Sequence, residues 1–139
     1  MNIYFACSLT GGRADQSTYA LIVNHLVKLG HDVPTAHLAN PDVMDLETIV
    51  DPNEVYERDI AWIQSADGVV AEVSTPSHGV GYEIAYALQL GRDILCCHKE
   101  GVPVSKMITG NASPHLTVHA YPNPAEVIRI VDEYLHSLR

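Results

Sequence analysis

The sequence predicts an α/β fold: a single-domain, flavodoxin-like (Rossmann-like) arrangement of five parallel strands with helices on both faces. Short apolar runs alternate with amphipathic segments along the whole chain. Such alternation favours a parallel sheet covered on both sides. The length of 139 residues suits one hydrophobic core rather than two. We therefore expect residues 1–139 to form one domain.

The first half of the chain holds three predicted strands and two predicted helices. The apolar runs 3–7, 31–38 and 68–73 read as strands, the second more weakly than the others. Between the first two, apolar residues recur at helical spacing from about 16 to 29, and Gly30 ends that helix. Asp51-Pro52-Asn53-Glu54 predicts the start of a second helix, which should reach about Ser65, because Asp caps it and Pro occupies its first turn.

The second half repeats the pattern. We expect a helix over about 79–90, stopped by Gly91, and then a strand over 93–98. A long connection follows, in which 105–108 reads as one helical turn. The run 116–121 is the fifth predicted strand, and Asn123-Pro124-Ala125-Glu126 predicts the cap of a final helix. In a sheet of this order the ligand crevice lies at the carboxyl ends of the first and third strands. The loops to inspect are therefore 8–15 and 74–81, which we call the first and the second crevice loop.

Composition excludes several partners. The formal net charge is −9, and the 8 Lys and Arg residues are scattered rather than clustered. A nucleic-acid polymer or an anionic membrane needs a basic face, so neither is expected as a partner. No apolar stretch approaches the roughly 20 residues of a membrane span, and Met1-Asn2 leads directly into the first strand without a signal peptide. We expect a cytoplasmic protein whose cysteines, Cys7, Cys96 and Cys97, are reduced core residues.

Two carboxyl groups are the candidate catalytic residues. Glu83 should lie in the first turn of its helix, at the crevice floor, where the helix N-terminus would keep it ionised. Asp59 falls inside the apolar stripe of its own helix, so burial should raise its pKa. Opposed environments of this kind separate a nucleophile from an acid in glycosidases. The alternatives are that Glu83 only complements the helix dipole and that Asp59 only hydrogen-bonds a neighbouring loop.

The turn before Glu83 is a candidate phosphate cradle. Gly79 and Gly81 lack side chains, so a ligand could approach the backbone there, and Ser77 adds a hydroxyl donor. The third glycine of the dinucleotide fingerprint and the Gly-Lys-Ser/Thr of a P-loop are missing, which argues against NAD or nucleoside triphosphates. His115 and His119 could share a strand face, but no third ligand stands at a recognisable spacing. We expect neither a metal nor a cofactor, and no Ser-His-Asp triad is apparent.

A set of ordered segments resembles the nucleoside 2-deoxyribosyltransferase superfamily, and within it the branch that hydrolyses 2'-deoxynucleoside 5'-phosphates. The likeness runs nearly from end to end. The segments that carry it are Ile3-Tyr4-Phe5, Ser8 with Gly11-Gly12-Arg13, Arg58-Asp59 with Trp62, Ala66-Asp67, Val70-Ala71-Glu72-Val73, and Ser77 through Glu83.

The resemblance implies a role for each matching residue. Glu83 would be the nucleophile that takes the deoxyribosyl C1' into a covalent intermediate. Asp59 would act as the acid or hydrogen-bond partner at the leaving base, and Tyr4 would orient Glu83. The 5'-phosphate would be held by Ser77 and the Gly79 N–H, with Ser8, Gly11 and Gly12 also in the site. Ser105 matches a serine that reaches into the site of the second subunit, so a homodimer is implied.

The same resemblance leaves several activities open. Transferases that act on free nucleosides tend to place an acidic residue near the position of Ser77, where it would repel a phosphate dianion. Ser77 therefore favours a nucleoside 5'-monophosphate substrate and hydrolysis. Thr10 stands where the resemblance leads us to expect Arg, which bears on affinity and on 2'-deoxy selectivity. Base exchange, cleavage of cytidine-type ribonucleotides and non-catalytic nucleotide binding remain as alternatives.

Overall fold

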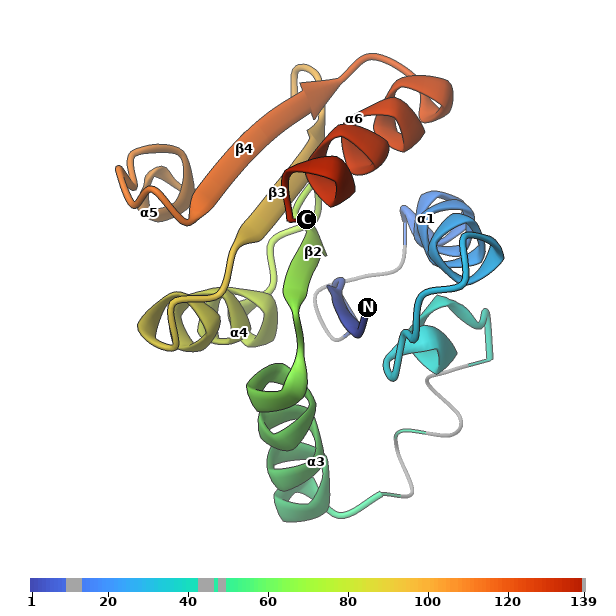
Figure 1. Ribbon diagram of the computed structural model, residues 1–139, viewed down its shortest axis with the longest axis vertical. Helices are drawn as coiled ribbons and strands as arrows, with labels where there is room; N and C mark the ends of the chain where they lie inside the picture. Colours follow the sequence, from blue (N-terminus) through green and yellow to red (C-terminus); the bar gives the residue numbers. More distant parts are fainter. Residues whose placement is uncertain (10–13, 43–46, 48–49, 139) are drawn as a thin grey trace.

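Within the residues that the structure describes, the sheet has four parallel strands. The structure, a computed structural model, describes residues 1–9, 14–42, 47 and 50–138. The strands neighbour one another in sequence order (Figure 1), with Ile3 opposite Gly68, Val69 opposite Ile94, and Ile94 opposite Leu116. Their bounds are β1 Ile3–Ala6, β2 Gly68–Glu72, β3 Ile94–Lys99 and β4 Leu116–Tyr121.

The helices begin where the capping signals predict. Asp51 accepts a hydrogen bond from the Asn53 N–H at 2.8 Å, and Asn123 accepts one from the Glu126 N–H at 3.1 Å. The expected helical turn after β3 is a short helix capped by Ser105. The helical elements are α1 Gln16–Lys28, the 3-10 helix η1 Ala36–Ala39, α3 Pro52–Ser65, α4 His78–Gln89, α5 Lys106–Thr109 and α6 Pro124–Ser137.

The prediction of a strand over 31–38 is wrong, and the described sheet therefore has four strands instead of the predicted five. Only one bridge forms there, between Asn2 and Asp32, after which the chain turns into η1. Pro34 lacks an N–H and cannot extend a ladder. Instead, the Thr35 side chain accepts the Phe5 N–H at 3.0 Å, so the edge of β1 is satisfied by a hydroxyl rather than by a fifth strand.

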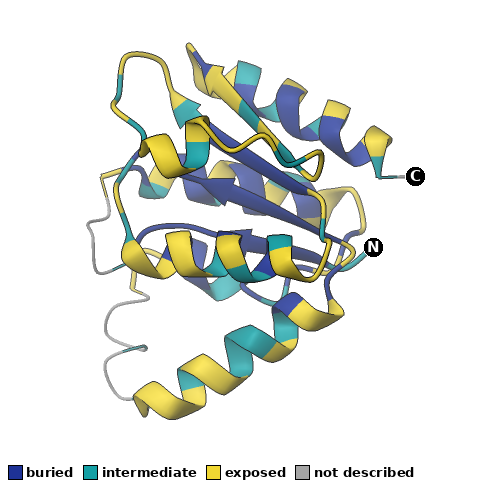
Figure 2. Cartoon of the chain, turned by 90° about the vertical axis from the view of Figure 1, so that its left-hand side faces the viewer, coloured by how far each residue is buried: buried dark blue, intermediate teal, exposed yellow. Residues whose placement is uncertain are grey.

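Helices cover both faces of the sheet, as expected. Figure 1 shows α1 and α6 on one side and α3 and α4 on the other. Each side has its own apolar core. Strands β1 and β2 and most of β3 are buried between the two cores (Figure 2), whereas most of the edge strand β4 is not. Alternate residues of β1 enter different cores: Ile3 and Phe5 face α1, whereas Tyr4 and Ala6 face α4. In the described part of the chain, no helix is long and apolar enough to cross a membrane.

The connections that follow β1 and β2 indicate where this fold is expected to bind a ligand. The chain leaves β1 through α1 on one face and returns to the neighbouring β2 through α3 on the other face (Figure 1). The chain leaves β2 into α4, on the face opposite α1 (Figure 1). In open α/β sheets, ligands bind at the carboxyl ends of neighbouring strands whose connections diverge in this way, so a site is expected at the loops that follow β1 and β2. Tyr4 points from β1 toward the α4 side, and α4 begins just after β2.

Candidate active site

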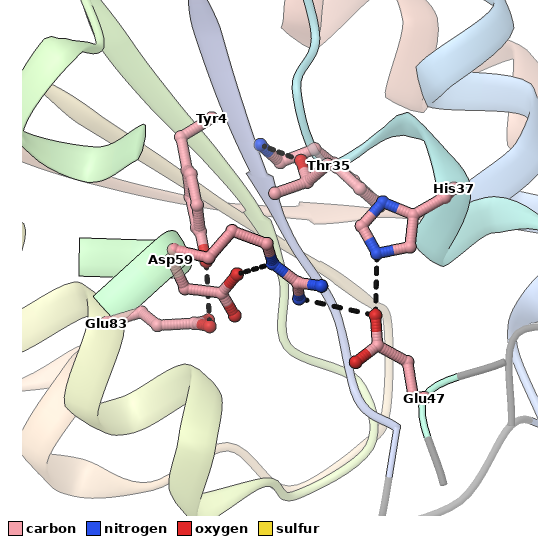
Figure 3. Close-up of polar contacts among 8 residues, drawn as sticks. Tyr4, Thr35, His37, Glu47, Asp59 and Glu83 are labelled. Atoms are coloured by element: carbon pink, nitrogen blue, oxygen red, sulfur yellow. Dashed lines mark hydrogen bonds and ion pairs between the residues drawn. The ribbon is translucent and has the colours of Figure 1, made fainter. Parts of the chain in front are cut away.

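Tyr4 and Glu83 form the centre of the candidate site. The Tyr4 side chain is fully buried, and its hydroxyl donates to Glu83 Oε1 at 2.9 Å. Figure 3 shows the phenol meeting the carboxyl between β1 and α4. Burial and the nearby Glu83 charge raise the pKa of the Tyr4 phenol, so it stays protonated and remains a donor. The contact joins residues that are 79 positions apart in the chain.

Glu83 does not lie in the first turn of its helix, contrary to the sequence prediction. Helix α4 begins at His78 with Ser77 as its cap, and its first turn contains no acidic residue. Glu83 therefore belongs to the second turn. The influence of a helix terminus falls off within the first turn, so the dipole is not what determines the charge of Glu83.

Burial dominates the ionisation of Glu83. Desolvation raises its pKa from the usual 4.5 to about 7, although the Tyr4 hydrogen bond lowers it and the Asp59 charge raises it further. At neutral pH the carboxyl is thus divided between its acid and its carboxylate. The prediction that the helix N-terminus keeps Glu83 ionised was wrong, because it considered the position of Glu83 in the helix and not the desolvation of its side chain.

Asp59 lies on α3 and has a charged partner. Its Oδ1 accepts a hydrogen bond from Arg58 Nε at 2.9 Å. Burial raises the pKa of the Asp59 carboxyl, as predicted, while Arg58 partly offsets that rise. Glu83 and Asp59 are therefore shifted in the same direction, which corrects the predicted opposition between them. The two differ instead in their partners: a neutral phenol for Glu83 and a guanidinium for Asp59.

Sequence reasoning missed a polar chain that extends the site beyond Asp59. Arg58 also contacts Glu47 Oε1 at 3.3 Å, and that same oxygen lies 2.7 Å from His37 Nε2 (Figure 3). The guanidinium lies 4.8 Å from the centre of the Trp62 ring, a cation–π geometry. Arg58 could have been suspected from its place beside Asp59. His37 and Glu47 could not. His37 was assigned to the predicted strand 31–38, and Glu47 lies in the polar stretch 39–50, for which the sequence predicts no element.

The turn that leads into α4 has the features of an anion site. Ser77 Oγ accepts the Val80 N–H at 3.3 Å, and a hydroxyl that accepts there can still donate to a ligand. The first amides of a helix, including that of Gly79, have no partner within the helix. A side chain at Gly79 would meet only Ser77 Oγ at 3.7 Å, and one at Gly81 would meet nothing within 4 Å. The backbone is thus open to a ligand.

The first crevice loop is only partly described. Ser8, at the carboxyl end of β1, is fully buried, and its hydroxyl has no hydrogen-bond partner among the described residues. Such a buried hydroxyl costs about 1–3 kcal/mol while it is unpaired, so an acceptor supplied by a ligand would be favourable. Gly11, Gly12 and Thr10 lie outside the described residues.

Ser105 is not near the Tyr4–Glu83 pair within one chain. It caps α5, is exposed, and accepts the Met107 N–H at 3.2 Å. Together with Ser77 it lines a groove of about 710 Å³ between α4 and the segment 103–113. Gly81, Ile84 and Ala85 supply the α4 wall of that groove, and Glu83 is not part of it. Ser105 and Glu83 therefore belong to different sides of α4.

The cysteines and histidines have no catalytic arrangement in the described residues. Cys7, Cys96 and Cys97 are buried in the core, as predicted, and no disulfide joins them. No group of three potential metal ligands occurs in the part of the chain that the structure describes. The titratable groups at the centre of the site include two carboxyls, with Glu83 available as a nucleophile or base and Asp59 as an acid or hydrogen-bond partner.

The chain is similar to proteins of a known family. The family model described as nucleoside 2-deoxyribosyltransferase matches residues 3–123. A 5-hydroxymethyl-dUMP N-hydrolase from Rattus norvegicus is 40% identical over 141 residues, which cover 98% of this chain and 85% of that protein. A Methanosarcina mazei protein, provisionally named a 2'-deoxynucleoside 5'-phosphate N-hydrolase, is 34% identical over 99% of this chain and 85% of its own length.

The fold is shared with a more distant solved structure. The CMP N-glycosidase of Clostridium botulinum superposes with a TM-score of 0.73 over 95% of this chain and 98% of that one, at 19% identity. At that identity the likeness shows the fold alone. The family match and the two close relatives decide the assignment: this chain belongs to the nucleoside 2-deoxyribosyltransferase family.

Proposed function

We propose that this protein hydrolyses the N-glycosidic bond of (2'-deoxy)nucleoside 5'-monophosphates, which releases the free base and a (2-deoxy)ribose 5-phosphate. The observation that carries the proposal is the buried Tyr4–Glu83 contact at 2.9 Å, with Asp59 close enough for its charge to raise the pKa of Glu83. Two carboxyl groups that influence one another are the working parts of a glycosidase. The relatives named as N-hydrolases support the same activity.

The reaction is a double displacement. The Glu83 carboxylate attacks C1' while the C1'–N bond breaks, and its electron pair leaves with the base, which takes a proton from Asp59. Water then adds its hydroxyl to C1' as the ester bond to Glu83 breaks, and its proton returns to Asp59. Each displacement inverts C1', so the anomeric configuration is retained overall.

The ionisation of the two groups is compatible with these roles. The pKa of Glu83 near 7 leaves part of the population ionised at neutral pH, and the Tyr4 hydroxyl donates to that carboxylate and restrains it. Burial raises the pKa of Asp59, which increases the fraction able to donate a proton. Arg58 limits this rise and holds the Asp59 carboxyl in place.

The 5'-phosphate is assigned to the start of α4. Ser77 offers a hydroxyl, Gly79 offers an amide, and the helix N-terminus favours an anion. An acidic residue at position 77 would repel the phosphate, whereas Ser donates to it. Ser8, Gly11 and Gly12, in the first crevice loop, complete the proposed substrate contacts within one chain.

The working enzyme is proposed to be a cytoplasmic homodimer of one-domain subunits. Ser105 lies on the far side of α4 from Glu83, so it can serve a site only if that site belongs to a second copy. The groove lined by α4 and segment 103–113 has mainly apolar walls, and Met107 at its rim is 84% exposed. An exposed apolar residue beside an apolar groove fits a symmetric contact between two copies.

A chromatographic assay tests the activity. Deoxyribonucleoside and ribonucleoside 5'-monophosphates are incubated with the protein, and free base and sugar phosphate are quantified. We expect stoichiometric release of both products, and a loss of at least 10²–10⁴-fold in rate for Glu83→Ala with nucleotide binding retained. Substantial residual hydrolysis by that variant would remove Glu83 from the nucleophile role.

Base exchange is the second candidate, favoured by the name of the matching family. It is separated from hydrolysis by incubating deoxyadenosine and deoxyadenosine monophosphate, each with and without free cytosine. A hydrolase releases adenine from the monophosphate without an acceptor, whereas a transferase needs cytosine and prefers the nucleoside. A non-catalytic nucleotide-binding protein would release no base and would bind equally well as Glu83→Gln.

A further inference from the structure

Asp15 stands at the cap position of α1 but does not cap that helix. Its carbonyl accepts the Thr18 and Tyr19 N–H groups at 2.9 and 3.1 Å, as a cap residue's carbonyl should. Its side chain makes no capping hydrogen bond, although such a bond usually contributes about 1 kcal/mol. Only 4% of Asp15 is exposed. Helix capping therefore does not explain why this carboxylate is buried.

That carboxylate joins the two crevice loops. Thr75 Oγ1 donates to Asp15 Oδ2 at 3.0 Å, and the Lys99 ammonium pairs with Oδ1. Asp15 ends the first crevice loop, Thr75 lies two residues before Ser77 in the second, and Lys99 is the last residue of β3. We call Asp15, Thr75 and Lys99 the loop clamp. It links segments that are 60 and 84 residues apart in the chain.

A second set of contacts lies beneath the clamp. Glu72, fully buried at the end of β2, accepts hydrogen bonds from the Ser74 hydroxyl and, at 2.9 Å, from Tyr121. Ser74 Oγ in turn accepts the Lys99 N–H at 2.8 Å. The segment from Glu72 to Thr75 is thus tied to β3, to β4 and to the start of α1. This is more restraint than a surface loop needs, and it ends just before the turn that begins α4.

We propose that Asp15 is a positioning residue for the phosphate subsite: through the loop clamp it sets the place of the Ser77–Gly79 turn relative to the start of α1 and the end of β3. The inference rests on the proposed function, because it assumes that the 5'-phosphate binds at that turn. Hydrogen-bond donors must meet a phosphate within a few tenths of an ångström, so a loop that is free to shift loses affinity for the phosphate in particular.

Electrostatics and positioning predict opposite signs for one variant. Asp15→Asn removes a negative charge near an anion site, so charge alone would tighten nucleotide binding. Loss of the clamp would weaken nucleotide binding, because a neutral amide forms no ion pair with Lys99 and keeps only one acceptor oxygen for the two donors of the clamp. Thr75→Val changes no charge and keeps the shape of the side chain, so it removes the hydrogen bond to Asp15, together with the contact to the Tyr19 hydroxyl, without an electrostatic change. Neither residue touches the reacting atoms in the proposed mechanism.

The test compares a nucleoside 5'-monophosphate with its matching nucleoside. Both are titrated calorimetrically into Glu83→Gln protein, which binds without turnover, alone and combined with Asp15→Asn or Thr75→Val. We expect the nucleotide to bind about tenfold more weakly in each combination, the equivalent of one lost hydrogen bond. The nucleoside should bind within about twofold of the parent. Glu133→Gln, which removes half of the exposed Arg129–Glu133 pair, is the matched control and should change neither.

Two outcomes would overturn the proposal. If nucleotide binding stays constant or tightens in both clamp variants, the clamp does not position the subsite. If nucleotide and nucleoside weaken equally, the role is merely structural. Where Asp15→Asn fails to fold, Thr75→Val decides alone. Failure of the proposed function has a different signature, since the unsubstituted protein would then release no base, whatever the binding ratios are.

Discussion

The pKa of the Glu83 carboxyl is set by burial of the side chain and by two neighbours that shift it in opposite directions. The Tyr4 hydrogen bond lowers its pKa, and the Asp59 charge raises it. Since the nucleophile must be ionised, kcat/KM should fall as pH drops below about 7. Tyr4→Phe removes a donor that favours the carboxylate, so the acid limb should move to higher pH. Asp59→Asn removes a repelling charge, so the limb should move to lower pH.

The measurement is a pH–rate profile of kcat/KM for base release by the three proteins. The substrate phosphate also titrates, near pH 6, but its contribution is common to all three profiles and cancels in the comparison. Asp59→Asn should in addition lower the rate by 10²–10⁴-fold if it is the proton donor. Limbs that shift in the same direction for both variants would contradict this account of Glu83.

Gly68 shows how closely β2 and α6 are packed. A Cβ at this position would lie 2.5 Å from the Tyr134 hydroxyl and 2.7 Å from Leu138 Cδ1. The same hydroxyl accepts the Val69 N–H at 3.0 Å and donates to the Asp93 carbonyl at 2.7 Å. Gly68→Ala should therefore destabilise the fold by about 1–3 kcal/mol, because neither the strand nor the tyrosine can yield freely.

Denaturant unfolding measures the effect, and a double substitution identifies its cause. In a Tyr134→Phe background the hydroxyl is gone, so Gly68→Ala should cost less than it does in the unsubstituted protein. Gly81→Ala is the control, because a Cβ there meets nothing within 4 Å and alanine favours a helix. Equal costs in the two backgrounds would show that the Tyr134 hydroxyl is not the obstacle.

The elements whose ends carry capping signals could be predicted from the sequence, whereas features set by distant residues could not. Helices α3 and α6 begin at their predicted caps because capping is a local interaction. The strand over 31–38 was predicted too long, because an apolar pattern cannot show that the Thr35 hydroxyl would accept the Phe5 N–H at the edge of β1. Burial of Asp59 could be read from helical periodicity. The pKa of Glu83 near 7 and the partners of Asp15 could not, since they depend on contacts between segments far apart in the chain.

The whole molecule presents an apolar surface on its α4 side that a second copy would cover. The groove between α4 and segment 103–113 is bordered by Met107, the most exposed of the large hydrophobic residues in the described chain. Met107→Glu should yield a monomer in sedimentation experiments and reduce activity, because an unpaired charge within the proposed apolar interface would destabilise it. Val27→Glu, at a residue 52% exposed on α1 across the sheet, should do neither. A Met107→Glu protein that sediments like the unsubstituted protein would argue against this interface.

Subunit mixing tests whether Ser105 completes the partner's site. Glu83→Gln and Ser105→Asp proteins should each be inactive, the first for lack of a nucleophile and the second because a carboxylate would repel the phosphate. When equal amounts are mixed and allowed to exchange, about half of the dimers are mixed, and each has one site with both native residues if Ser105 acts across a two-fold interface. Activity should then return to about a quarter of that of the unsubstituted protein. If both residues of a site come from one chain, every site in the mixture carries a substitution, and no activity returns.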